Sequence, residues 1–230
     1  MRVSDVQHVP DVPDAALRLF EEVMVASVGA HGRFLVALSG GSTPLPTYRT
    51  LAERPDLPWQ HTWVFWGDER FVAQDDPDSN AGAAFAAFLD AVPVPRSQLF
   101  PWPHLDTPEA SAEAYARAVE SALGEHGAFD LTFLGLGADG HTASLFPGTG
   151  AALRTGATLV VRPEGERVRL SLGTRLLNRS RTVAFLVQGE GKRAALESTL
   201  TGEGDVDRYP ARAIRAQERL VVLTDLDGVA

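Results

Sequence analysis

Residues 129–148, FDLTFLGLGADGHTASLFPG, join an apolar run to a glycine-rich loop. The run at 131–134 has the composition of a strand that is buried on both faces of a parallel sheet. The glycines at 135, 137 and 140 allow backbone angles closed to other residues and let a ligand approach the main chain. Asp139 and His141 lie in this loop. Because ligands of open α/β sheets bind beyond the carboxyl ends of the strands, the stretch predicts a ligand site.

Outside this stretch, apolar runs alternate with segments of helical period. We expect further strands at 34–38, 62–66, 158–161, 168–172, 182–187 and 220–223. Helices are expected at 14–28, 81–89, 108–123 and from about 192 to 200, and a proline-rich surface connection at 93–103. The alternation predicts one α/β domain over residues 1–230. Its architecture is a doubly wound, mostly parallel sheet with helices on both faces, Rossmann-like α/β/α.

The composition limits the possible functions. A net charge of −9 argues against general nucleic-acid binding and requires that an anionic substrate be met by a local cluster of cations. The chain has no cysteine, so disulfides, thiol nucleophiles and cysteine zinc sites are excluded. The first residues, MRVSDVQHVPDVPD, contain no apolar core of a signal peptide, and no apolar run is long enough to span a membrane. A soluble cytoplasmic protein is the expectation.

A second glycine-rich turn follows the strand expected at 34–38. In this turn Thr43 is suited to cap a helix and Pro44 to occupy its first position. Backbone N–H groups at such a strand-to-helix turn favour a phosphate, although a plain tight turn is the alternative. No lysine follows, so this is not the nucleotide-binding P-loop. The candidate phosphate-binding residues are Ser39, Gly40, Gly41, Ser42 and Thr43.

Charged residues follow other strands as well. Asp68 and Arg70 come directly after the strand at 62–66, where they would either face a ligand or lie in a solvated loop. In the alternating strand at 168–172, Arg169 and Ser171 share one face. Lys192 lies where a strand leads into a helix. For Arg169 and Lys192 the alternative to phosphate binding is a surface ion pair.

These motifs together resemble the 6-phosphogluconolactonases. Residues 135–147 match the pattern G-x-G-x-D-G-H-T-A-S-L-F-P of that family, and the segments S-G-G-S-T-P, W-G-D-E-R, D-S-N, R-[IVL]-[ST]-L and G-x-x-K recur along the chain. The chain departs from the pattern at Ala81, where many members have an aromatic residue, and at Gly173, where a Thr or Ser is usual. We assign no substrate contact to Ala81. If the hydroxyl group at position 173 touches the substrate in other members, that contact is missing here or Thr174 replaces it.

The resemblance implies hydrolysis of 6-phospho-D-glucono-1,5-lactone in the oxidative pentose phosphate pathway. It places Arg169 and Lys192, with the 39–43 turn, on the phosphate, and for these two residues it extends to amino-sugar-phosphate deaminases of similar fold. His141 is the candidate base that activates water. Asp139 either orients His141 or binds a hydroxyl group, Arg70 is the candidate donor to the carbonyl oxygen, and Asp68 is an alternative acid or hydroxyl-binding group. No metal and no cofactor are expected.

Two other functions compete with this one. The first is a glucosamine-6-phosphate isomerase or deaminase, which shares the fold, the glycine-rich phosphate turn and an Asp at position 68. The second is a sugar-phosphate sensor domain without catalysis, but such a regulator needs a DNA-binding module, and the region before Ser39 is expected to hold one helix and one strand. The expected partner is a sugar-phosphate lactone, with no nucleic acid and no membrane, and the chain is expected to be a monomer or a small homo-oligomer.

Overall fold

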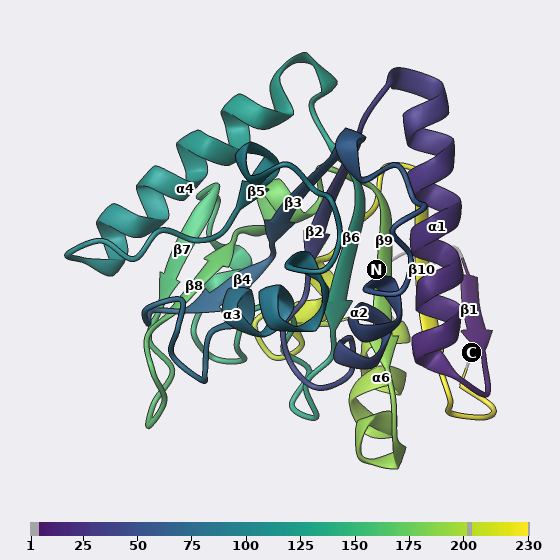
Figure 1. Cartoon of the computed structure of the whole chain (residues 1–230). Coiled ribbons are helices and arrows are strands. Elements are labelled where there is room, and N and C mark those ends of the chain that lie inside the picture. Colours follow the sequence, from purple (N-terminus) through teal and green to yellow (C-terminus); the bar gives the residue numbers. More distant parts are fainter. Residues whose placement is uncertain (1–4, 202–203, 230) are drawn as a thin grey trace.

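A seven-stranded, entirely parallel sheet forms the centre of the molecule (Figure 1). The computed structural model describes residues 5–201 and 204–229. In spatial order the strands of this sheet are β1 (Asp5–His8), β10 (Arg219–Thr224), β9 (Ser180–Val187), β6 (Phe129–Gly135), β2 (Phe34–Leu38), β3 (Thr62–Trp66) and β5 (Leu99–Phe100). The fold predicted from the alternating pattern, a mostly parallel sheet between helices, is confirmed.

The strand order reverses between β2 and β6. From β2 the chain adds β3 and β5 on one side, then returns to place β6 against the other side of β2 and continues to β9 and β10. Such a reversal separates the loops that follow the two central strands and opens a crevice between them. The glycine-rich loops after β2 and β6 therefore start side by side at the carboxyl edge of the sheet.

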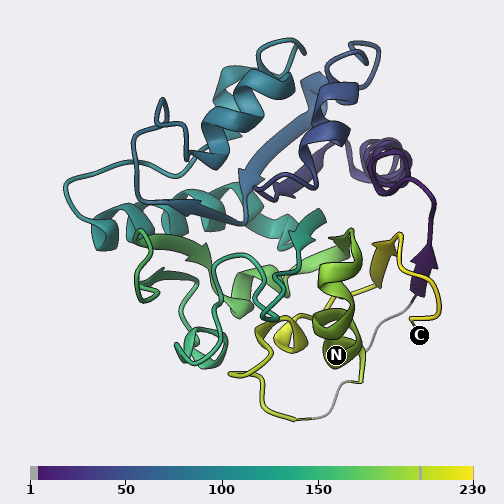
Figure 2. The same ribbon diagram turned by 90° about the horizontal axis from the view of Figure 1, so that it is seen from below.

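Helices cover both faces of this sheet (Figure 2). The α-helices are α1 (Val12–His31), α2 (Leu45–Leu51), α3 (Asn80–Ala84), α4 (Pro108–Leu123), α5 (Thr174–Leu177) and α6 (Arg193–Leu200). Shorter helical turns are η1 (Trp59–His61), η2 (Phe85–Leu89), η3 (Arg96–Gln98), η4 (Gly124–His126), η5 (Ala151–Leu153), η6 (Glu190–Lys192) and η7 (Pro210–Ala213). In Figure 2, α1 and α2 lie on one side of the strands, whereas α4 and α6 lie on the other. No helix in the described ranges has the length and apolar character needed to cross a membrane.

Helix α1 illustrates how local sequence sets these elements. The Asp11 carboxylate caps its first turn by accepting the Asp14 N–H at 2.9 Å, and Pro13 occupies the first turn, where no N–H is needed. Gly32 ends the helix in the left-handed conformation with φ 81°. The side chain of Phe20 is fully buried and contacts Phe34 of β2 edge to face, with ring centroids 5.2 Å apart. Burial of this apolar face holds the helix on the sheet.

A second, smaller sheet was not predicted as such. It is antiparallel and joins β4 (Asp68–Arg70), β8 (Arg169–Leu172) and β7 (Thr158–Val161), with α4 packed against it. Its register aligns Asp68 with Ser171 and Arg70 with Arg169. The charged segment after β3 is therefore an ordered strand and not a solvated loop.

Three other expectations need correction. Residues 93–103 are not only a connection, because β5 forms there and closes one edge of the main sheet. The N-terminal region contains β1, which pairs with β10, so two strands and one helix precede Ser39. The helix expected at 81–89 is α3 followed by the wider π-helical turn η2. Edge strands this short carry too little periodicity to be recognised in the sequence.

Candidate active site

A pocket of about 320 Å³ lies at the carboxyl edge of the main sheet. Its walls come from the segments that follow β2, β3, β6 and β9, together with part of β8. Of the predicted site residues it brings together Ser39, Gly40, Gly41, Ser42, Thr43, Asp68, Arg70, His141, Arg169 and Lys192. The remaining one, Asp139, lies behind His141 and lines a neighbouring cavity.

His141 and Asp139 form a hydrogen-bonded pair. The imidazole Nδ1 lies 2.6 Å from Asp139 Oδ1, and the same oxygen accepts the backbone N–H of His141 at 3.1 Å. An ionised carboxylate only accepts hydrogen bonds, so Nδ1 carries a proton, and in the neutral form of the imidazole Nε2 keeps its lone pair. Burial raises the pKa of Asp139, but the hydrogen bonds from His141 outweigh this effect and hold the pKa below its ordinary value. The imidazole is therefore oriented with a free basic nitrogen.

Gly137 makes room for this pair. A Cβ atom at position 137 would lie 2.1 Å from Nδ1 of His141 and 2.4 Å from Oδ1 of Asp139, far inside contact distance. The loop closes on itself because the Gly137 N–H donates to the His141 carbonyl at 2.8 Å. Phe146 packs against the other side of the imidazole, with ring centroids 4.6 Å apart. The loop thus confines His141 between a glycine and an aromatic ring.

Asp68 is fixed by the loop after β6. Its Oδ2 accepts the Ser144 hydroxyl at 2.6 Å, and the Ser144 N–H donates to the Ser171 hydroxyl at 3.3 Å. Ala143, which precedes this serine, has φ 46°, a left-handed angle that is uncommon for residues with a side chain. This strained residue turns the loop so that Ser144 reaches the small sheet. Asp68 and His141 therefore face the same pocket from two different elements.

Arg70 is held by neutral groups. Its Nη1 donates to the Asp78 carbonyl at 3.2 Å and to the Asn80 side-chain oxygen, and Asn80 Nδ2 donates to the Asp68 carbonyl at 2.9 Å. Within the described ranges no carboxylate forms an ion pair with Arg70, so its charge is available to a ligand. A Cβ atom at Gly40 would lie 2.0 Å from the Asn80 side-chain oxygen. The absence of a side chain at Gly40 therefore leaves the space that Asn80 occupies between the 39–43 turn and β4.

Glu69 binds the start of helix α3, which contains Asn80. Its buried carboxylate accepts the N–H groups of Asn80 at 2.7 Å and Ala81 at 2.8 Å and the Ser79 hydroxyl at 3.1 Å. Burial raises the pKa of Glu69 even though these hydrogen bonds oppose the shift. Ser79 caps α3, since its hydroxyl accepts the N–H of Gly82 at 3.0 Å. The side chain therefore holds the first turn of α3 against β4.

The glycine-rich turn after β2 is anchored by a buried tyrosine. The Tyr48 hydroxyl donates to the Ser39 carbonyl at 2.9 Å and accepts the Ser39 N–H at 3.1 Å. Gly41 has φ 88°, which only glycine adopts readily. Helix α2 begins one residue later than predicted: Pro44 is at the N-cap position and no side chain caps the helix, so Thr43 is part of the turn. The turn faces the pocket with its hydroxyl groups and backbone.

Arg169 and Lys192 approach the pocket from the other side. Arg169 is mostly buried and pairs with Glu166, whose carboxylate lies 2.5 Å from Nη2, while its Nε is buried without a partner. Its guanidinium also lies 5.9 Å from the centre of the Phe146 ring. Over residues 5–201 and 204–229, Lys192 has no ion-pair partner, because the adjacent Glu190 binds Arg193. The pocket of this acidic protein therefore contains cations with capacity to bind an anion.

Sequence reasoning missed four residues of this site. Asn80, Ser144 and Phe146 occur in the sequence only as letters of matching motifs, and no pattern singles out Glu166. Their roles depend on contacts between β4, β8 and the loop after β6, which no local spacing reveals. The Asp-Ser-Asn segment at 78–80 was a usable signal, because it matches a motif of the family.

His141 is the only imidazole among the described residues that line the pocket. The prediction of no metal or cofactor stays a prediction for this pocket. Elsewhere in the described part of the chain one group of side chains could hold a metal ion, and it lies at the other end of β6.

The sequence matches one family model over residues 9–223, described as glucosamine-6-phosphate isomerases/6-phosphogluconolactonase. It is 43% identical over 204 residues to a 6-phosphogluconolactonase of Synechocystis sp., covering 86% of this chain and 85% of that protein. A 6-phosphogluconolactonase of Nostoc sp. is 38% identical over 228 residues, covering 96% and 95%. The crystal structure of the Thermotoga maritima 6-phosphogluconolactonase superposes with a TM-score of 0.87 at 28% identity and covers 97% of this chain and 99% of that one.

Proposed function

This chain belongs to the family of glucosamine-6-phosphate isomerases and 6-phosphogluconolactonases, and we propose that it hydrolyses 6-phospho-D-glucono-1,5-lactone to 6-phospho-D-gluconate. The observation that carries the proposal is one pocket that combines an oriented imidazole with unneutralised cations. A phosphorylated ester needs a base at one end and an anion site at the other. The pocket contains candidates for both: His141 for the base, and Arg169 and Lys192 for the anion site.

The phosphate binds between the turn at 39–43 and the side chains of Arg169 and Lys192. Among the residues that the structure describes, the Nε of the planar Arg169 guanidinium has no hydrogen-bond partner and the Lys192 ammonium group has no ion-pair partner. Backbone N–H groups of the turn add neutral donors, which stabilise an anion without a further charge. Glu166 pairs with Arg169, so a phosphate competes with this carboxylate for the guanidinium.

The lactone carbonyl then lies near His141. The imidazole Nε2 removes a proton from a water molecule as its oxygen bonds to C1, and the carbonyl electrons move onto oxygen. Arg70 stabilises this oxyanion. The intermediate collapses, the bond from C1 to the ring oxygen breaks, and the imidazolium returns the proton to the departing ring oxygen. Asp139 keeps the imidazole in the tautomer with Nε2 free and stabilises the imidazolium.

Asp68 binds a sugar hydroxyl group in this scheme. Its Oδ2 is already occupied by the Ser144 hydroxyl, so the carboxylate is fixed and its remaining lone pairs face the pocket. A carboxylate held in this way orients the ring without taking part in proton transfer. The same residue is the candidate acid or base if the chain is a deaminase.

The test measures both activities of the family on one preparation. Purified protein is added to 6-phospho-D-glucono-1,5-lactone, and acid release is compared with spontaneous hydrolysis; glucosamine 6-phosphate is assayed in parallel for ammonia. We expect acceleration of the first reaction and none of the second. Ammonia release without lactone hydrolysis would identify a deaminase, and binding of both sugars without turnover would identify a sensor domain.

A further inference from the structure

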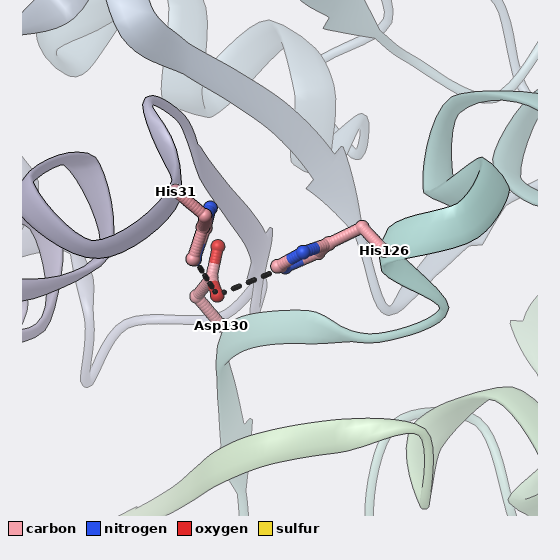
Figure 3. Close-up of side chains that lie close together, drawn as sticks. All are labelled: His31, His126 and Asp130. Carbon is pink, nitrogen blue, oxygen red and sulfur yellow. Dashed lines mark hydrogen bonds and ion pairs between the residues drawn. The ribbon is translucent and has the colours of Figure 1, made fainter.

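Three side chains converge at the amino edge of the main sheet, at the opposite end of β6 from the pocket (Figure 3). His31 is the last residue of α1, His126 ends η4, and Asp130 is the second residue of β6. The two imidazoles approach the same carboxylate, and each Nε2 lies 3.1 Å from Asp130 Oδ1. These residues are far apart in the sequence or on different elements, so tertiary packing brings them together.

We propose that His31, His126 and Asp130 form a binding site for a divalent transition-metal ion of the Zn²⁺ type. Two imidazole nitrogens and one carboxylate oxygen are a donor set that suits Zn²⁺ and Co²⁺. The donor atoms lie within 4.8 Å of one another. Ligands at about 2.0–2.2 Å from one ion are roughly 3–3.5 Å apart, so both nitrogen-to-oxygen distances already fit.

The carboxylate is held in place for this role. Asp130 is fully buried, and its Oδ2 accepts the Leu35 N–H at 2.8 Å, which directs Oδ1 toward the imidazoles. A hydrogen bond that orients a ligand from behind is the usual support of a metal site. His126 is nearly buried, whereas the His31 side chain is about a quarter exposed at 26%. An ion can therefore enter from the His31 side while the other two ligands stay enclosed.

Neighbouring cations limit the affinity. Arg181 Nε lies 3.7 Å from Asp130 Oδ1, although the same side chain is paired with Glu218 at 2.8 Å. The positive charge of Arg33 also acts on His126. One carboxylate facing these charges favours weak, reversible binding over a permanently occupied structural site.

The bound ion joins α1, η4 and β6. Binding to the folded chain alone raises its stability by mass action. The seven residues of β6 span roughly 20 Å, so the ion does not touch the pocket. The proposal is independent of the activity assigned to that pocket.

The experiment is calorimetric titration of EDTA-treated full-length protein with ZnCl₂, repeated with CoCl₂ while visible absorption reports the ligand set. We expect one site per chain in the parent, with affinity at least about 100-fold lower in His31→Gln and in His126→Gln. A 100-fold excess of Zn²⁺ over its Kd should raise the Tm of the parent by about 5–10 °C. Lactone turnover should be equal in the stripped and the loaded protein.

His8→Gln is the matched control, because His8 forms a single imidazole–carboxylate pair with Asp227 at 3.0 Å and has no second histidine. It should leave Zn²⁺ binding unchanged. A circular dichroism spectrum and a cooperative thermal transition like those of the parent, both recorded without metal, show that His31→Gln and His126→Gln are folded. Absence of binding in the parent would mean that the cluster is a hydrogen-bond network and would overturn the proposal. Zn²⁺ binding that persists in both variants and disappears in His141→Gln would place the ion in the pocket and would also overturn the proposal.

Discussion

One imidazole–carboxylate group lies beside each end of strand β6. At its carboxyl end, Asp139 is half exposed and His141 faces a pocket. At its amino end, Asp130 is fully buried and contacts His31 and His126. The residue types are the same, but in the described structure the group at the carboxyl end lines, through His141, a pocket that a substrate can enter.

The difference lies in what each carboxylate does. Asp139 binds Nδ1 and leaves Nε2 of His141 free, whereas Asp130 binds Nε2 of both of its histidines. The loop after β6 exposes one pair at the edge where ligands bind, and packing of α1 and η4 covers the other. Reactivity therefore follows from the nitrogen that remains unpaired and from access, and not from the presence of His and Asp.

The largest effect should come from removing the imidazole at the carboxyl end. His141→Ala should lower kcat by roughly 10²–10⁴-fold, the usual contribution of a general base. His126→Ala should keep kcat of the folded fraction within about threefold of the parent, because His126 lies at the other end of β6. Steady-state rates on the phosphorylated lactone measure both. Comparable losses in the two variants would contradict the distinction between the ends.

Displacing the pair without removing it should have the next largest effect. Gly137→Ala forces His141 and Asp139 away from their positions, and a displacement of about 1 Å can cost 10²-fold in rate. Gly191→Ala is the matched control, since a Cβ there meets nothing within 4 Å and the backbone angle is not left-handed. A Gly137→Ala enzyme with the kcat of the parent would show that the position of the imidazole does not limit the reaction.

Replacing Arg169 or Lys192 should lower kcat/KM only for the phosphorylated substrate. Hydrogen bonds to charged groups are worth about 1.5–3 kcal/mol, so Arg169→Ala or Lys192→Ala should lower kcat/KM roughly 10–150-fold. Glucono-1,5-lactone lacks the phosphate, and its weak turnover should barely change. The comparison is kcat/KM on both lactones. An equal fractional loss on the two would mean that these residues maintain the site and do not bind the phosphate.

Asp130, at the amino end of β6, should contribute more to the free energy of unfolding than Asp139 at the carboxyl end. Asp130→Asn removes a buried charge that accepts the Leu35 N–H and faces two imidazoles, so the free energy of unfolding should fall by about 1.5–3 kcal/mol. Asp139→Asn at the half-exposed end should cost less than about 1 kcal/mol. Urea unfolding at pH 7, with metal removed by EDTA, measures both. The reverse order would show that the burial of each carboxylate does not determine its contribution.

The smallest effect should be the pH dependence of the stability that Asp139 contributes. Burial raises its pKa, but hydrogen bonds from His141 outweigh this, so the folded-state pKa lies below the unfolded value of about 3.9. A depressed folded-state pKa contributes stability that is present above the unfolded pKa and is lost as pH falls through the folded one. The Tm difference between the parent and Asp139→Asn should therefore be present at pH 7 and shrink in acid. A difference that grows on acidification would contradict the assigned direction.

Much of the main sheet could be predicted from local pattern. The strands at 34–38 and 62–66 have the predicted bounds, and the helix at 108–123 ends where its period does. β1 and β5 were missed because two to four residues at a sheet edge give no usable period. The loop residues that reach the pocket, His141 and the turn at 39–43 among them, were located because glycine-rich turns after buried strands have a local signature.

Local sequence is enough to identify the residues that end the buried strands, because apolar runs and glycine turns are properties of neighbouring residues. Tertiary structure alone decided which of those residues meet. Arg70 reaches Asn80 and Asp68 reaches Ser144 only after β4 pairs with β8, and Glu69 is buried only because α3 folds over it. His31 meets His126 only when α1 packs on β6. Such contacts depend on packing between distant elements, and the free energy that selects them is shared over the whole core and not encoded in any local stretch.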